Sequence, residues 1–144
     1  MKTTIIIFII LSISSVIFAG TYNMYIIGKY IATDKTTGLM FDRTLCSKMT
    51  WENALKYCKK SKTGGFSDWR LANIKELGSI VSYTKTDPAI NKIAFPDTQS
   101  EMYWSSTTDP RNKKHAYVIN FHIGSKESVP KTELCWVRAV RGKE

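Results

Sequence analysis

Residues 64–77, with the sequence GGFSDWRLANIKEL, constrain the fold more than any other part of the chain. A Gly-Gly pair ends one structural unit, and Trp69 and Arg70 follow it within a few residues. Asn73 then starts a new helix, with Glu76 three residues on, as in a capping box. This order of a break, an aromatic residue, an arginine and a capped helix is typical of a compact domain outside the cytoplasm.

Residues 1–19 have the composition of a secretory signal peptide. Lys2 provides a positive charge, residues 5–18 form an apolar stretch, and Ala19 precedes a glycine. The stretch of 14 residues is shorter than the roughly 20 that a transmembrane helix needs. We therefore predict that residues 1–19 are removed on export to the periplasm or the cell surface. An uncleaved N-terminal anchor is the alternative.

The rest of the chain suits a single packed domain. Hydrophobic residues make up 43% of the sequence, and no repeat, low-complexity linker or domain boundary is evident. The formal net charge is +9, which favours anionic partners such as lipid headgroups, acidic glycans or nucleic acid. A cationic surface that serves solubility alone is the alternative.

Two amphipathic helices are predicted, one starting after Thr50 and one near Asn73. Their apolar stripes consist of Trp51, Ala54, Leu55 and Cys58 in the first helix and of Ile74, Leu77 and Val81 in the second. Short β-prone runs surround them at residues 25–27, 30–32, 39–41, 103–107, 115–123 and 135–140. This order of elements predicts an α+β fold with an antiparallel sheet. Residues 20–33 would form a lead-in strand or hairpin, and residues 34–142 the main domain.

Six side chains are predicted to have structural roles: Trp51, Trp69, Arg70, Glu76, Trp104 and Arg138. We expect Trp69 and Trp104 to pack in the core. Arg70 would pair with a carboxylate such as Asp68 or Glu76, because the planar guanidinium can form two parallel hydrogen bonds.

No catalytic or metal-binding set is evident in the sequence. No Ser, His and acidic residue have the spacing of a catalytic set, and Cys58 lies on an apolar helix face, which predicts a buried and inert thiol. There is no CxxC pair, and the only histidines lie far from Cys46 and Cys58 in the sequence, so a zinc site is not expected. We predict a protein that is not an enzyme and needs no cofactor.

Basic side chains are the best indication of a ligand. The candidate ligand-binding residues are Lys56, Lys59 and Lys60 in the first helix and Arg111, Lys113 and Lys114 in a polar loop. Lysine and arginine suit sulfate and carboxylate groups. A solvated cationic surface without a ligand is the alternative.

Six motifs occur in an order that resembles one bacterial family. They are TGLMF at 37–41, TWENALKYC at 50–58, GGFSDWRLANIKEL at 64–77, FPD at 95–97, YWSST at 103–107 and VRAVRG at 137–142. Together they resemble the domain at the C-terminus of the Legionella collagen-like protein, a domain largely of unknown function. The sequence departs from the family at Ala139, where many members have a cysteine that pairs with the position of Cys58.

The resemblance implies a C-type-lectin-like domain over residues 34–142, in which the N- and C-terminal strands pair and two helices flank them. It also implies binding of sulfated polysaccharides and adhesion. The calcium-binding motifs of the wider fold, Glu-Pro-Asn or Gln-Pro-Asp with Trp-Asn-Asp, are missing from the sequence. We therefore expect an exported binding module for an acidic or sulfated polysaccharide or an envelope protein. A structural or assembly component of the bacterial envelope, without a small ligand, is the alternative.

Three cysteines leave one thiol over if a disulfide forms. If the terminal strands pair so that Met40 lies opposite Val140, Cys46 falls opposite residue 134. We therefore predict a Cys46–Cys135 disulfide with Cys58 buried and free. A Cys58–Cys135 bridge, which would preserve the family's helix-to-strand link, is the alternative.

Overall fold

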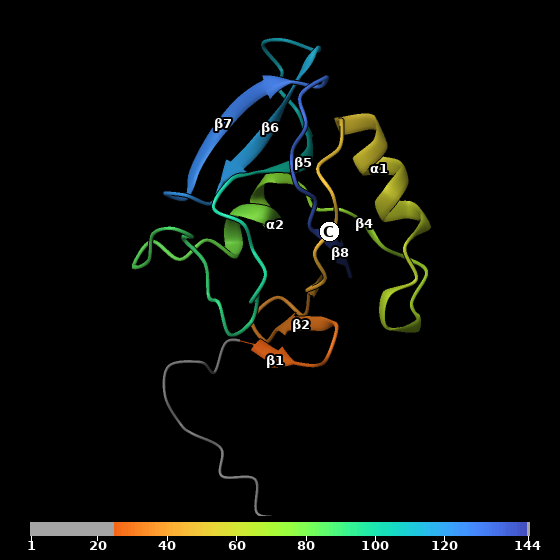
Figure 1. The fold of residues 1–144 in the computed structure, drawn as a ribbon. Coiled ribbons are helices and arrows are strands. Elements are labelled where there is room, and N and C mark those ends of the chain that lie inside the picture. Colours follow the sequence, from red (N-terminus) through yellow and green to blue (C-terminus); the bar gives the residue numbers. More distant parts are fainter. Residues whose placement is uncertain (1–24, 144) are drawn as a thin grey trace, which may run out of the picture.

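The computed structural model describes residues 25–143, so the predicted signal peptide lies outside the described residues. This range contains two helices and eight strands, and the strands form two antiparallel sheets (Figure 1). The strands are β1 (Tyr25–Ile27), β2 (Ile31–Asp34), β3 (Met40–Asp42), β4 (Arg70–Leu71), β5 (Met102–Thr108), β6 (His115–Asn120), β7 (Ser125–Pro130) and β8 (Ala139–Arg141). The helices are α1 (Trp51–Lys60) and α2 (Ile74–Ser79), and η1 (Thr63–Gly65) is a 3₁₀ turn.

The larger sheet has the strand order β1-β2-β3-β8-β4. Its centre confirms the predicted pairing of the first and last parts of the domain, because β3 runs antiparallel to β8 with Phe41 opposite Val140. β4 flanks β8 on the other side, with Leu71 opposite Ala139. The two-residue strand β4 was not predicted, since a run of two residues has no periodicity to detect.

The smaller sheet consists of β5, β6 and β7 in sequence order. Gly124 has a φ of 80° in the turn between β6 and β7, a left-handed conformation that glycine adopts without strain. The segment before β8 joins the two sheets. In that segment Trp136 forms a parallel bridge with Tyr103 of β5, whereas Cys135 forms an antiparallel bridge with Met49.

The predicted final strand at residues 135–140 is therefore wrong in extent. β8 begins only at Ala139, because residues 135 and 136 pair with segments outside the larger sheet. The side chains of this run nevertheless alternate between two faces, as those of a strand do. Cys135, Val137 and Ala139 belong to one hydrophobic core, whereas Val140 belongs to the other and Trp136 packs against it.

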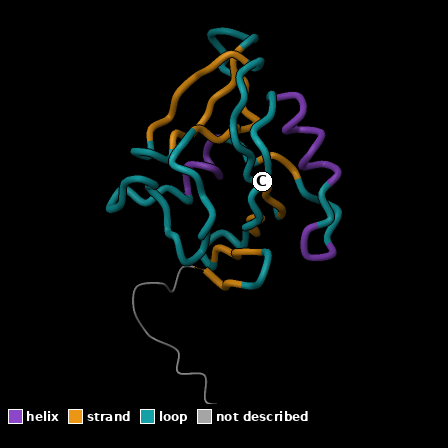
Figure 2. The backbone as a smooth tube through the Cα atoms, viewed as in Figure 1, coloured by secondary structure: helices purple, strands orange, loops and turns teal. Residues whose placement is uncertain are grey.

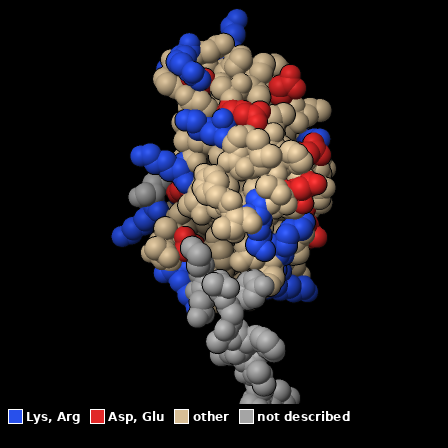
Figure 3. Space-filling model, turned by 90° about the vertical axis from the view of Figure 1, so that its left-hand side faces the viewer, with Lys and Arg blue, Asp and Glu red and all other residues tan. Residues whose placement is uncertain are grey.

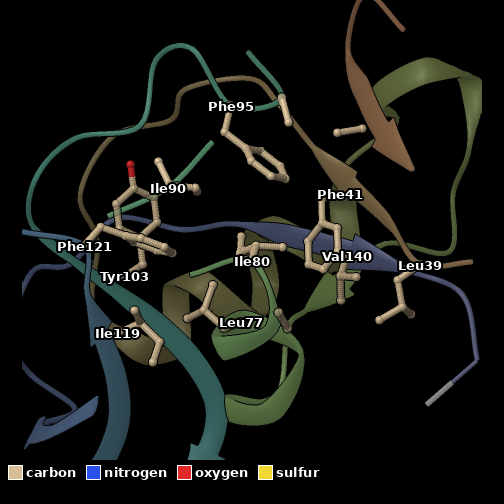
Figure 4. Close-up of a cluster of buried hydrophobic side chains, with 13 residues drawn as sticks. Leu39, Phe41, Leu77, Ile80, Ile90, Phe95, Tyr103, Ile119, Phe121 and Val140 are labelled. Carbon is tan, nitrogen blue, oxygen red and sulfur yellow. The ribbon is translucent and has the colours of Figure 1, made fainter. Parts of the chain in front are cut away.

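The two cores lie on opposite faces of this C-terminal segment. The first lies under α2 and the long loop that follows it, and Figure 4 shows Phe41, Phe95 and Val140 converging there from distant parts of the chain. The second is covered by α1 and contains Ala54 and Cys58 with Trp69 and Trp104. Figure 2 shows that most of the chain between α2 and β5 is irregular.

Of the two capping interactions predicted at the helix starts, the structure forms one. The Asn73 side chain accepts hydrogen bonds from the backbone N–H groups of Lys75 and Glu76, and Glu76 accepts one from Asn73 N, which confirms the capping box. Thr50 occupies the N-cap of α1, but its side chain makes no capping hydrogen bond. In the described range, neither helix has the length and hydrophobicity that crossing a bilayer would require.

The prediction of a Cys46–Cys135 disulfide is wrong, because all three thiols of the described chain are free. Met40 lies opposite Arg141 and not Val140, and Cys135 lies opposite Met49. The segment between β3 and α1 thus contains more residues than a regular ladder would accommodate. Cys46 instead points its sulfur at the carbonyl oxygen of Val137, 3.7 Å away.

Candidate functional site

A pocket of about 390 Å³ opens between α1, β4 and β5. Its walls are formed by Leu55, Lys59, Trp69, Arg70, Leu71 and Ser106. The floor is mainly apolar, and the two cationic side chains come from α1 and β4. A small concave site with an apolar floor and a few polar groups is the usual form of a ligand pocket.

Two side chains of the pocket floor, Trp69 and Leu71, are buried. The indole Nε1 of Trp69 donates a hydrogen bond of 3.0 Å to the carbonyl of Thr63 in η1. This bond links the floor to the turn that follows α1. The Gly64 of this turn has a φ of 63°, a left-handed conformation for which glycine is suited.

Arg70 is held by Glu76 through two hydrogen bonds of 2.7 Å, and it also donates to the carbonyl of Gly142. Burial raises the pKa of Glu76, but hydrogen bonds from Arg70 and Asn73 and the charge of Arg70 outweigh burial, so the net pKa is lowered. Glu76 is thus ionised and compensates the positive charge of Arg70. Lys59, the other cation of the pocket, has no carboxylate partner among the described residues.

The predicted ligand residues of α1 form a continuous cationic face. Lys56, Lys59 and Lys60 are exposed and lie three and four residues apart, on neighbouring positions of the helix surface. Among the described residues, none of the three makes an ion pair or a hydrogen bond through its side chain. The one acidic residue of α1, Glu52, lies in the first turn. We call Lys56, Lys59 and Lys60 the α1 lysine face.

The predicted ligand residues of the β5–β6 loop are in a different situation. Arg111 donates to both carboxylate oxygens of Asp109, at 3.0 and 2.8 Å. The hydroxyl groups of Ser128 and Tyr117 donate to the same carboxylate, at 2.6 and 3.3 Å. Hydrogen bonds from Arg111 and Ser128 hold the pKa of Asp109 well below its usual value. The loop therefore compensates one of its own cations, while Lys113 and Lys114 remain exposed.

The structure does not combine these six residues into one site. The backbone N–H of Trp51 donates to Lys131 O, and the N–H of Lys131 donates to Lys114 O, so Lys114 is linked to the first turn of α1. The α1 lysine face occupies the second half of the helix, about 12 Å further along its axis. Figure 3 shows the side of the molecule away from α1, where basic and acidic side chains are interspersed.

The residues predicted as structural lie where the elements meet. Trp51 Nε1 donates to Ser105 O and Trp104 Nε1 to Met49 O, both at 2.8 Å, so the two indoles connect α1 and its preceding segment to β5. Arg138 is buried between the rings of Phe95 and Tyr103. It donates to Asp42 O at 2.7 Å and to Thr98 Oγ1 at 2.8 Å, which attaches the long loop to β3.

Sequence spacing missed one polar cluster, formed by Asp87, Ser100 and His122. Both the Ser100 hydroxyl, at 3.3 Å, and an Asp87 carboxylate oxygen, at 3.4 Å, approach the same ring atom, His122 Nδ1. A catalytic relay needs the nucleophile and the acid on different ring nitrogens, so this arrangement is not that of a serine hydrolase. Nothing in the sequence marks the cluster, because Asp87 and Ser100 lie in the long loop between α2 and β5 whereas His122 lies in the β6–β7 turn.

The thiols show no sign of activation. Burial raises the pKa of Cys58, and it raises that of Cys135 to about 12. Both thiols are therefore protonated and unreactive at neutral pH. In the part of the chain that the structure describes, no three His, Cys, Asp or Glu side chains gather as a metal site would require.

Comparison with known proteins confirms the predicted family resemblance and the fold. The sequence model of the family described as the Lcl C-terminal domain matches residues 30–141. Among solved structures, the crystal structure of botrocetin matches with a TM-score of 0.54 and 11% sequence identity, covering 81% of this chain and 98% of that chain. A likeness at this identity establishes the fold alone, and the fold is C-type-lectin-like. No curated protein matches the chain.

Proposed function

This chain belongs to the family of the Lcl C-terminal domain, and on that premise we propose that it is an exported, non-enzymatic binding module for anionic glycans. The C-type-lectin-like fold supports the coarser part of this proposal, a binding module. The finer part, the anionic glycan, is supported by the α1 lysine face and the pocket beside it.

The observation that carries the proposal is the position of Lys59. It belongs to the uncompensated α1 lysine face and also forms one wall of the pocket. A sulfated or carboxylated sugar has an apolar ring face and a charged substituent. The apolar floor of Leu55, Trp69 and Leu71 suits the first, and an ammonium group suits the second.

The size of the pocket limits what can enter it. A volume of about 390 Å³ lies at the lower end of the range for small-molecule sites. It suits one or two sugar units, and a longer polysaccharide would continue along the α1 lysine face towards Lys56. This geometry favours a linear polyanion with regularly spaced charges.

Binding to a glycan array at low and at physiological ionic strength tests the proposal. We expect sulfated and uronic-acid polysaccharides to be retained and neutral dextran not to be, with retention decreasing as salt increases. Equal retention of neutral and anionic glycans would contradict the proposal. Retention of anionic glycans that is insensitive to the Lys59→Glu substitution would also contradict it.

A further inference from the structure

The end of the larger sheet formed by β1 and β2 exposes large apolar side chains. Ile26 is 61% exposed, Ile27 39%, Tyr30 44% and Ile93 49%. Ile26 and Ile27 point to opposite faces of the sheet, as successive residues of a strand do. Neither side chain is fully covered by other described residues, and among these β1 is the edge strand of the larger sheet.

Arg43 connects the two backbone segments that carry these side chains. Its guanidinium donates to the carbonyl oxygens of Gly28 and Lys29 in the β1–β2 turn and to those of Ile93 and Ala94 in the long loop. The turn and the loop are thereby fixed side by side. We call the resulting group of Ile26, Ile27, Tyr30 and Ile93 the apolar tip.

The charged side chains that residues 25–43 expose at the surface are of one sign. Residues 25–43 contain three basic residues, Lys29, Lys35 and Arg43, and two acidic ones. The acidic residues, Asp34 and Asp42, are both buried. Their carboxylates accept hydrogen bonds from Thr36 N, Thr37 Oγ1, Thr44 N, Thr44 Oγ1 and Thr63 Oγ1. The exposed charges of residues 25–43 are therefore cationic.

The third observation is the position of the apolar tip in the fold. Figure 1 shows β1 and β2 at one end of the molecule, away from the sheet of β5, β6 and β7.

We propose that the apolar tip is a docking surface for a lipid bilayer with anionic headgroups. Isoleucine and tyrosine side chains at the surface, with lysines beside them, suit the boundary between headgroups and acyl chains. Lys29 and Lys35 add attraction to anionic lipids. The free backbone edge of β1 must keep hydrogen bonds to water, so the docking is shallow.

Two other partners fit less well. A second copy of the chain, paired edge to edge through β1, would bring Lys29 and Lys35 of both copies close together, and like charges oppose that contact. An anionic polysaccharide would be attracted by the lysines but would leave Ile26, Ile27 and Ile93 exposed to water. A lipid surface is the partner that satisfies both the apolar and the cationic side chains.

Vesicle flotation tests the proposal with the chain that starts at residue 20. Both cores and both sheets lie within residues 25–141, so this chain contains the whole described fold. We expect it to float with phosphatidylcholine vesicles that contain phosphatidylglycerol. The Ile26→Ser/Ile27→Ser variant should bind these vesicles about tenfold more weakly, because apolar area no longer leaves water.

A matched control removes exposed apolar side chains elsewhere. Tyr83 and Ile123 are 81% and 58% exposed and lie outside the apolar tip, so Tyr83→Ser/Ile123→Ser should bind vesicles like the parent chain. If the Ile26→Ser/Ile27→Ser variant fails to fold, as its melting curve would show, Lys29→Glu/Lys35→Glu serves instead. That variant should lose binding to anionic vesicles by about tenfold.

Three outcomes would overturn the proposal. The parent chain could fail to bind anionic vesicles, the two tip variants could bind as well as the parent, or the Tyr83→Ser/Ile123→Ser control could lose as much. Sedimentation velocity adds a fourth, a dimer that the Ile26→Ser/Ile27→Ser change dissociates, which would identify a second copy as the partner. Glycan binding by the Ile26→Ser/Ile27→Ser variant, which keeps the net charge, should equal that of the parent, so this proposal can fail without affecting the proposed function.

Discussion

The α1 lysine face and the β5–β6 loop have similar basic residues in the sequence but different electrostatics in the structure. On α1, Lys56, Lys59 and Lys60 have no acidic partner among the described residues. In the loop, Arg111 is bound to Asp109 through two hydrogen bonds. A cation whose charge is already compensated contributes less to a ligand, because binding must compete with the existing carboxylate.

The difference follows from the backbone around each cluster. A helix places residues three and four apart on one surface, and in α1 Lys59 and Lys60 follow Lys56 at these two spacings. The loop returns to β6 through a tight turn, which brings Asp109 beside Arg111, Tyr117 and Ser128. Only the first arrangement leaves several like charges facing the solvent next to a pocket.

The largest effect should come from reversing charge on α1. We expect Lys59→Glu/Lys60→Glu to weaken binding of a sulfated polysaccharide by about thirtyfold, which corresponds to about 2 kcal/mol. The cause is the loss of attraction and the added repulsion at the pocket wall. Isothermal titration calorimetry at low ionic strength measures the change. An affinity within a factor of about two of the parent would remove α1 from the site.

The second prediction concerns Glu76, the carboxylate that compensates Arg70 in the pocket. Glu76→Gln should lower the free energy of unfolding by about 1–2 kcal/mol, because it weakens the bonds to Arg70 and Asn73. It should also strengthen polyanion binding by about threefold, since Arg70 is no longer opposed by a carboxylate. Thermal melting and the same titration measure both. Weaker polyanion binding by a variant that still melts cooperatively would show that Arg70 does not face the ligand.

The third prediction concerns the loop carboxylate. We expect Asp109→Asn to lower the Tm at neutral pH by a few degrees, because Arg111, Ser128 and Tyr117 lose a charged acceptor. The pKa of Asp109 in the folded protein lies below its ordinary value of 3.8. The ionised carboxylate therefore stabilises the fold above this pH, and its contribution is lost as the pH falls below it.

The measurement is a series of melting curves for parent and variant between neutral and acidic pH. The difference in Tm should be constant at neutral pH and should close as the pH falls below 3.8. A difference that stays the same down to the lowest pH at which the parent folds would show that the carboxylate's charge has no part in holding the loop.

The smallest effect should come from the matched change in the loop. Lys113→Glu/Lys114→Glu alters the net charge by the same amount as the α1 variant, but it acts away from the pocket. We expect polysaccharide binding to weaken by less than about threefold, through long-range electrostatics alone. Losses of equal size from the two double variants would show that net charge, and not the α1 lysine face, determines binding.

Much of the fold could be predicted from short-range patterns. The capping box of Asn73 and Glu76 fixes the start of α2, and alternation in residues 135–140 assigns Val137 and Val140 to different cores. These patterns act over a few residues, where the geometry of a helix or strand leaves little choice. The extent of the last strand was not predictable in this way, because Cys135 and Trp136 pair with Met49 and Tyr103, far away in the sequence.

The candidate site was predicted only in part. The lysines of α1 were identified from their helical spacing, but the pocket beside them also needs Ser106 of β5 and the unpredicted strand β4. The register error that placed Cys46 opposite residue 134 has the same origin. An irregular segment between β3 and α1 shifts by several positions which residues of the two chain segments lie opposite each other. No local sequence pattern indicates the size of this shift.

The sequence by itself determined the starts of the two helices, most of the strands and the α+β order, because hydrophobic periodicity and capping are properties of neighbouring residues. The strands β4 and β7 were not predicted. The tertiary structure decided which charges remain available. The sequence predicted a carboxylate partner for Arg70, and Glu76 is that partner. It did not distinguish Arg111 from Lys59, yet Asp109 compensates Arg111 and no described carboxylate compensates Lys59. That distinction depends on which side chains meet across the fold, and electrostatic compensation acts through space and not along the chain.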